Sequence, residues 1–225
     1  MNLDYKYIDR IKTPTPNQSI NMISISSIKN FAMMNLVINE AKLNQYAHLA
    51  KVNVAELPPE HHLAYSLAIH SLTSGQCNEP YERLLSDVLG VVNLEQKHGW
   101  DGVDTLENMQ EVYEYKPSSN ALAPSATIND DSVAKIEKCE HLAVEGKKGW
   151  LILAGIDKDN FNFKVIYKFP LDIYTADRKH YLQSTIEKNK EKTKQTRITY
   201  GINVKKSITL CETLDVPYYV WQNKM

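Results

Sequence analysis

The sequence predicts an α/β (α+β) fold in which helices flank a mixed β-sheet. Three observations support this prediction. The first half of the chain carries apolar residues at helical spacing. Later runs of strand length are rich in valine, isoleucine and tyrosine. Helical segments are expected between those runs, and strands that alternate with helices are typical of a sheet that helices cover.

The first part of the chain is predicted to be mostly helical. Residues 1–22 are polar, contain two Thr-Pro steps, and are expected to form an irregular arm ahead of a single domain over residues 23–225. Three stretches within residues 23–97 show helical spacing, and prolines stand at the start of the last two, where the first helical turn tolerates them. We expect helices over residues 24–54, 58–75 and 79–97.

Residues 98–225 are predicted to contain the sheet. The segment 110–116 alternates apolar and polar residues, as a half-buried strand does, and Pro117 is expected to end it. The run Trp150–Ile156 is apolar throughout and has the length of a strand. We expect strands over residues 110–116, 150–156 and 161–169, a hairpin turn at 157–160, and helices over residues 131–144 and 177–193. After residue 197, strand-like and helical patterns mix, and neither is predicted.

The composition is that of a soluble globular protein, with 43% hydrophobic and 24% charged residues among 225. No apolar run approaches the ~18 residues of a membrane span. Charged residues near the N-terminus argue against a secretory signal there. The three cysteines lie far apart without metal-site spacing, which predicts reduced thiols in an intracellular, cytoplasmic compartment.

Charge is divided unevenly along the chain, although the net charge is only −1. Residues 51–114 contain eleven acidic and three basic residues, whereas residues 178–206 contain nine basic and two acidic ones. An acidic part that holds cations beside a basic part that holds phosphates suits a metal-dependent enzyme acting on nucleic acid. A solvated basic helix in an otherwise neutral protein is an equally common origin of such a pattern.

The stretch GWDGVDTLENMQEVYEYK contains the candidate catalytic groups. If residues 106–109 form a four-residue hairpin loop, Asp101 lies directly across from Glu114. Side chains opposed on one face have Cβ atoms ~4.5–5.5 Å apart, so the two carboxylates repel unless a cation binds them. Strand alternation places Lys116 on the face of Glu114, and the group suits a hard divalent cation beside a phosphate. An acidic surface hairpin is the alternative, and a register shift of one residue would bring in Asp104 or neither aspartate.

The pattern Asp101…Glu114-Tyr115-Lys116 resembles the signature of the PD-(D/E)XK nuclease superfamily, in which an acidic residue precedes Glu-x-Lys on the adjoining strand. The text GWDGVD…EVYEYK is similar to that of type II restriction endonucleases, although Trp100 stands where the family has a proline. The wider order of helices, hairpin, helix and two further strands agrees with the resemblance. It implies a restriction-endonuclease-like mixed-sheet core, Mg²⁺ as cofactor with Mn²⁺ as the alternative ion, and hydrolysis of phosphodiester bonds in double-stranded DNA.

The resemblance also implies a role for each residue of the pattern. Asp101 and Glu114 would hold the metal ion, and the carbonyl oxygen of Tyr115 would add a ligand. Lys116 would orient or help to deprotonate the attacking water, and would stabilise charge on the phosphate in the transition state.

Further acidic candidates come from the same region. Asp104 is the second choice for the aspartate. Family members often bring another glutamate to the metal site from an N-terminal helix, and Glu82 fits that position best as a further metal ligand, with Glu79 behind it. An ordinary solvated charge on a helix explains Glu82 equally well.

The basic segment is expected to contact DNA phosphates, which gives affinity that falls with salt but reads no sequence. The candidate DNA-binding residues are Lys188, Lys190, Lys192, Lys194, Arg197, Lys205 and Lys206. Other metal or nucleophile patterns are weaker. The histidines His61, His62 and His70 have no further ligand at fitting spacing, and Cys139 and His141 are too close in sequence.

The favoured function is a Mg²⁺-dependent DNA endonuclease, of the sequence-specific type II restriction class, that acts as a homodimer without contact to a membrane. The helical part of the chain is the expected dimer face. Two alternatives remain: a non-catalytic DNA-binding or structural protein on a related scaffold, and a structure-specific repair or recombination nuclease.

Overall fold

The computed structural model describes residues 33–73, 78–94, 99–129, 145–188 and 199–223. Residues 31–225 group into one compact unit. The predicted arm at residues 1–22 and the predicted helix at residues 131–144 lie outside the described residues.

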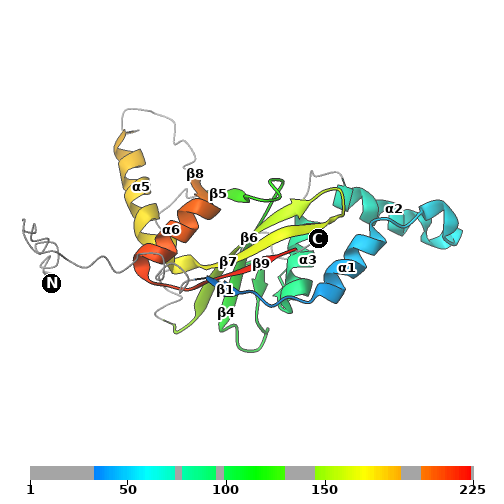
Figure 1. Ribbon diagram of the computed structural model, residues 1–225, viewed down its shortest axis with the longest axis horizontal. Helices are drawn as coiled ribbons and strands as arrows, with labels where there is room; N and C mark the ends of the chain where they lie inside the picture. The colour runs from blue at the N-terminus through cyan, green and yellow to red at the C-terminus, as the bar shows by residue number, and fades with distance from the viewer. Residues whose placement is uncertain (1–32, 74–77, 95–98, 130–144, 189–198, 224–225) are drawn as a thin grey trace, which may run out of the picture. The chain divides into compact units, whose positions relative to one another are not determined.

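Seven of the described strands form one mixed sheet in the order β1-β9-β7-β6-β4-β3-β2 (Figure 1). Their bounds are β1 Met33–Asn35, β2 Val92–Asn93, β3 Gly102–Val103, β4 Glu111–Ser118, β6 Lys148–Asp157, β7 Asn162–Pro170 and β9 Tyr218–Gln222. The pairs β4/β6 and β1/β9 are parallel and the others antiparallel. A separate antiparallel pair joins β5 (Ser125–Asn129) to β8 (Thr199–Asn203). A mixed sheet with flanking helices confirms the predicted fold class.

Strand β6 lies between β4 and β7, where its apolar run is covered on both faces. Alternate residues enter two separate apolar clusters: Ile152 packs with Tyr115 on one face, and Leu151 packs with Phe169 on the other. The helices are α1 Glu40–Leu49, α2 Pro59–Thr73, α3 Glu79–Leu89, α5 Thr175–Lys188 and α6 Val204–Leu214, with short 3₁₀ turns at Val54–Glu56 and Leu171–Tyr174. Helices α1 and α3 cover the first face and α6 covers the second (Figure 1). None of the helices in the described part of the chain is long and apolar enough to span a membrane.

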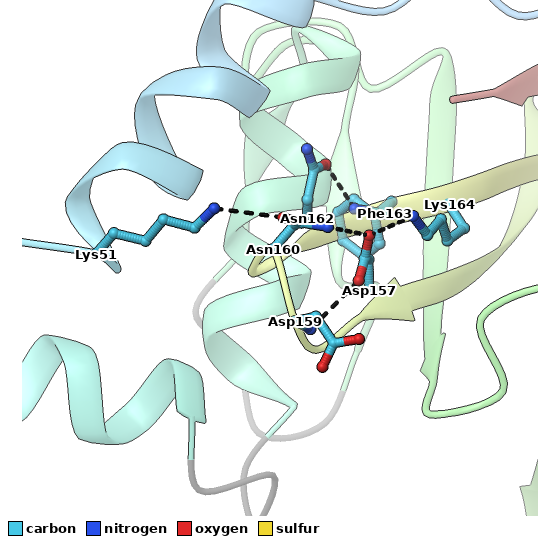
Figure 2. Close-up of polar contacts among 7 residues, drawn as sticks. All are labelled: Lys51, Asp157, Asp159, Asn160, Asn162, Phe163 and Lys164. Carbon is cyan, nitrogen blue, oxygen red and sulfur yellow. Dashed lines mark hydrogen bonds and ion pairs between the residues drawn. The ribbon is translucent and has the colours of Figure 1, made fainter. Parts of the chain in front are cut away.

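The predicted hairpin between β6 and β7 is confirmed, and its turn is held by side chains (Figure 2). The buried carboxylate of Asp157 accepts a hydrogen bond from the Asn160 amide, with 2.9 Å between the atoms, and pairs with the Lys164 ammonium at 2.7 Å. Lys51, which follows α1, donates to Asn160 at 3.3 Å. The turn therefore links the sheet to the end of a covering helix.

The first predicted helix is wrong over its described first part. Residues 33–35 form a strand that pairs with β9, and the helix begins only at Glu40, after the side chain of Asn39 accepts a hydrogen bond from the Lys42 backbone. Helical spacing could not reveal β1, because a three-residue strand is specified by its distant partner rather than by a local pattern.

The third predicted helix is too long. It ends at Leu89, where Gly90 adopts a left-handed conformation with φ of 69°, and the chain continues into β2. Glycine is the residue that most readily takes this conformation at a helix end.

Pro117 does not end its strand as predicted, because β4 continues to Ser118. Tyr113 pairs with Gly102 of β3, so its backbone N–H faces β3. Backbone groups two residues apart point to the same side of a strand, so the N–H of Tyr115 and the nitrogen of Pro117 face that side as well. The register of β3 ends at Gly102. A proline is tolerated here because its missing N–H would have faced an edge that no described strand extends.

Candidate active site

The hairpin of β3 and β4 has the register that the sequence predicts. Gly102 pairs with Tyr113 and Val103 pairs with Val112, as the predicted register requires, and Asp101 lies one residue before the first of these pairs. The loop closes with a backbone hydrogen bond from Met109 to Thr105, with 3.1 Å between nitrogen and oxygen. The paired residues agree with the predicted register, and residues 104–110 connect the two strands.

Asp101 lies directly before β3, and both its backbone and its side chain bind β4. Its N–H donates to the carbonyl of Tyr113 at 2.9 Å, and its Oδ2 accepts from the N–H of Tyr115 at 2.6 Å. In a strand, the N–H and C=O of one residue point to the same side. The carbonyl of Tyr115 therefore faces the edge where the Asp101 carboxylate lies.

The position of this edge is fixed by a buried contact beneath it. The Ser86 hydroxyl of α3 donates to the phenol oxygen of Tyr115 at 2.8 Å, and both residues are buried. A Cβ on Gly102 would lie 2.3 Å from that phenol oxygen, so only glycine leaves room for the contact. Ser86 and Gly102 are not predicted from sequence, because a serine in an amphipathic helix and a glycine in a hairpin carry no distinctive signal of their own.

Glu114 and Lys116 lie on one face of β4, since they alternate with the buried Tyr113 and Tyr115. Their side chains form an ion pair in which each is 24% exposed, so the pair is accessible without being freely solvated. Burial lowers the pKa of Lys116, but attraction to Glu114, Asp101 and Glu82 outweighs burial and raises it above its ordinary value. Lys116 is therefore an ammonium ion at neutral pH.

Two further carboxyl groups bind protons unusually tightly. Burial and then repulsion by Glu114 raise the pKa of Asp101 to about 6, although the Tyr115 N–H and Lys116 oppose the change. Burial and then repulsion by Asp101 raise the pKa of Glu82 to about 7. Glu82 of α3 thus interacts electrostatically with Asp101, Glu114 and Lys116 of the hairpin. Half-buried carboxylates that repel each other favour a bound proton or cation.

Asp104 and Glu79 occupy different positions from these four residues. The N–H of Asp104 donates to the carbonyl of Glu111 at 3.1 Å, which places Asp104 towards the loop of the hairpin. Its Oδ1 is buried without a hydrogen-bond partner. Glu79 makes a small contribution to the raised pKa of Glu82, which lies one helical turn further along α3. The structure thus brings together Asp101, Glu114, Lys116 and Glu82, and leaves Asp104 apart.

The donor set at this site fits a hard divalent cation. Within the described ranges, no three His, Cys, Asp or Glu side chains are grouped closely enough to hold a metal ion by themselves. Mg²⁺ does not require such a group, because it keeps several waters and is commonly held by one or two carboxylates. Asp101, Glu114 and the Tyr115 carbonyl offer only oxygen ligands, and a cation would relieve the repulsion that raises the pKa of Asp101.

The candidate DNA-binding residues are only partly described. Lys190, Lys192, Lys194 and Arg197 lie outside the described residues, while Lys188 at the end of α5 and Lys205 on α6 are exposed. Lys206 has a local role, because its ammonium lies 2.7 Å from an oxygen of Asp177 and 4.0 Å from the centre of the Tyr200 ring. Lys206 is therefore a weaker candidate for phosphate binding than Lys205.

The histidine and cysteine patterns give no competing site in the described part of the chain. The ring Nε2 of His62 lies 2.7 Å from the carbonyl oxygen of Leu57, which explains it as a local contact. Cys139 and His141 lie outside the described residues.

No family model matches the chain, and no curated protein or solved structure matches it either. A function can therefore be inferred only from the residues of the site and from the order of the elements that carry them.

Proposed function

We propose that the chain is a Mg²⁺-dependent endodeoxyribonuclease of the PD-(D/E)XK type that hydrolyses phosphodiester bonds. The observation that carries this proposal is that Asp101 accepts a hydrogen bond from the Tyr115 N–H of β4, while Glu114 and Lys116 form an ion pair on one face of the same strand. The raised pKa of Glu82 on α3 reflects burial and the charges of these three residues. The order of elements also supports it: helix α3 precedes the strands β2, β3 and β4, and β6 then lies parallel to β4.

The chemistry follows from the charges of the site. Asp101, Glu114 and the Tyr115 carbonyl would hold the Mg²⁺ ion, which when bound neutralises the negative charge of the scissile phosphate. Lys116 carries a positive charge at neutral pH, so its contribution is to attract the phosphate and to stabilise the charge that develops on phosphorus. In this proposal Lys116 orients the attacking water and stabilises charge rather than accepting a proton.

Glu82 is the carboxyl group near the site whose protonation changes near neutral pH. Its raised pKa, about 7, lets it exchange a proton near neutral pH. A carboxyl group with such a pKa is suited to accept a proton from the attacking water and to release it to solvent. In this proposal Glu82 adds a carboxylate to the metal site and is a candidate acceptor for the proton of the attacking water.

The substrate in this proposal is double-stranded DNA, and the class is the sequence-specific type II restriction enzyme acting as a homodimer. The uneven charge distribution supports a nucleic-acid substrate, because exposed Lys188 and Lys205 belong to the basic part of the chain. Two copies would supply one active site for each DNA strand.

Incubation with supercoiled plasmid in Mg²⁺, with EDTA as the control, tests the proposal. Discrete fragments that depend on Mg²⁺ are the expected result. A smear would retain phosphodiester hydrolysis but refute sequence specificity, in favour of a repair or recombination nuclease. An intact plasmid with reduced mobility would refute catalysis and favour the DNA-binding alternative.

A further inference from the structure

Helix α2 presents an apolar surface that the rest of the described chain does not cover. Leu63 is 71% exposed and Leu67 is 59% exposed. Ala64 and Ala68, which lie beside them on the helix, are exposed as well. We call these four residues the α2 face. Leucines four positions apart lie one above the other on a helix, so the two exposed leucines form one continuous strip.

The α2 face is not the side by which the helix packs on its own chain. His62, Tyr65 and Ile69, at helical spacing on another side of α2, are the partly buried residues. Helix α2 contacts α3 and lies on the side of α1 and α3 away from the sheet (Figure 1). A surface helix normally turns a charged face to water, whereas a helix that is apolar on two sides is normally covered on both.

The charges of α2 fit a second copy of the same helix. Glu60 is the only Asp, Glu, Lys or Arg residue between Pro59 and Thr73, so two copies would meet without repulsion between like-charged strips. In an antiparallel crossing centred between the two leucines, Leu63 packs against Leu67 of the second copy. In the same crossing Glu60 lies opposite His70 of the second copy, because residues 60 and 70, like residues 63 and 67, lie at equal distances on either side of residue 65.

The antiparallel arrangement has two further physical advantages. It sets the helix dipoles head to tail, so that the N-terminal end of one helix lies beside the C-terminal end of the other. The alanines next to the leucines have small side chains, which lets the two backbones approach closely. A two-fold crossing of this kind uses one surface on both molecules, as closed dimers do.

We infer that the α2 face is a self-association surface through which two copies of this chain pair antiparallel. The inference rests on the exposed leucines and the charge pattern of α2, and does not depend on the proposed nuclease activity. A 15-residue helix is about 22 Å long, and a single helix pair is a small interface, so the dimer is expected to dissociate on dilution.

Sedimentation velocity at low and high micromolar concentration tests this inference. The wild type is expected to shift from monomer to dimer as concentration rises. The double variant Leu63→Glu, Leu67→Glu is expected to stay monomeric, because it places four carboxylates in one contact. Leu122→Glu is the matched control, since Leu122 is also 71% exposed but lies away from α2, and this variant is expected to dimerise like the wild type.

A second measurement fixes the direction of the pair. A mixture of the single variants Leu63→Cys and Leu67→Cys is expected to form a disulfide-linked heterodimer on mild oxidation, because the antiparallel crossing opposes these two positions. Efficient cross-linking of either single variant to itself in place of the heterodimer would indicate a parallel pair, and Leu122→Cys is expected to give no cross-link. Thermal unfolding of each variant shows that it remains folded. A wild type that stays monomeric at high concentration, or a dimer that the glutamate variant does not dissociate, would overturn the inference. The first result would also refute the homodimer of the proposed function, whereas phosphodiester hydrolysis is tested separately by plasmid cleavage.

Discussion

The carboxylate of Asp101 accepts a hydrogen bond from the backbone N–H of Tyr115, with 2.6 Å between Oδ2 and the nitrogen. The bond satisfies a backbone donor at the edge of β4, beyond the last residue pair of β3. It also fixes the Asp101 side chain beside the carbonyl of Tyr115. One hydrogen bond therefore occupies the N–H of Tyr115 at the strand edge and brings two of the proposed metal ligands together.

Asp101→Asn and Asp104→Asn should differ strongly in activity. Asparagine at 101 keeps an oxygen that accepts from the Tyr115 N–H, so the fold is retained, but it loses the charge that binds the metal. We expect a loss of plasmid cleavage on the order of 100-fold or more for Asp101→Asn. Asp104 is apart from the site, so Asp104→Asn should cleave at close to the wild-type rate. The reverse order of effects would show that the hairpin register does not select the catalytic aspartate.

The raised pKa values of Asp101 and Glu82 predict how stability depends on pH. Because the folded state binds these protons more tightly than the unfolded state, stability without metal should fall as pH rises from the ordinary values of 3.8 and 4.5 towards about 6 and 7. Mg²⁺ competes with the same protons. It should therefore raise the thermal midpoint more at pH 8 than at pH 5.

Thermal unfolding with and without Mg²⁺ at the two pH values measures this effect without any need for activity. The variant Asp101→Asn should remove most of the Mg²⁺ effect, and Asp104→Asn should leave it in place. An equal effect of Mg²⁺ at pH 5 and pH 8 would mean that the ion binds elsewhere.

Gly102→Ala should destabilise the protein and disturb the site together. The new methyl group would lie 2.3 Å from the phenol oxygen of Tyr115, which is already bonded to Ser86. We expect a loss of about 1–3 kcal/mol in the free energy of unfolding, measured by denaturant titration. Gly201→Ala is the matched control, because no atom lies within 4 Å of its added Cβ and it also lies in a strand. Equal effects of the two changes would refute the steric account.

Lys205→Ala and Lys206→Ala should separate DNA binding from stability. Lys205 is exposed, so its removal should weaken DNA binding. If Lys205 contacts one phosphate, the slope of the logarithm of the binding constant against the logarithm of the salt concentration should become shallower by about 0.9. Lys206 pairs with Asp177 and lies over Tyr200, so its removal should lower stability by about 1 kcal/mol. Fluorescence anisotropy across a salt series and denaturant titration measure the two effects. A larger loss of DNA binding for Lys206→Ala would contradict this assignment.

Local patterns were sufficient to predict the hairpin of β3 and β4. Alternation along β4 placed Glu114 and Lys116 together, and the assumed four-residue loop gave the observed register. The apolar run at Trp150–Ile156 predicted β6 because a strand covered on both faces needs apolar residues at every position.

Non-local contacts account for most of what the sequence could not provide. Strand β1 exists because Met33–Asn35 pair with β9 at the other end of the chain. Pro117 remains in a strand because its neighbour in the sheet has ended, and this is visible only once β3 is placed. The phenol of Tyr115 meets Ser86 across 29 positions, and no spacing rule connects a serine on a helix to a tyrosine on a strand.

The most direct test of the proposed function is the rate of plasmid cleavage in Mg²⁺ by the site variants Glu114→Gln and Lys116→Met. The matched controls are Glu107→Gln in the hairpin loop and Lys158→Met in the β6–β7 turn. DNA binding in EDTA establishes that each variant still recognises its substrate. We predict that the wild type and both controls cleave at similar rates, while the two site variants bind DNA but lose cleavage by about 100-fold or more. Cleavage by both site variants at the wild-type rate, or a wild type that binds plasmid without cutting it, would contradict the proposed active site.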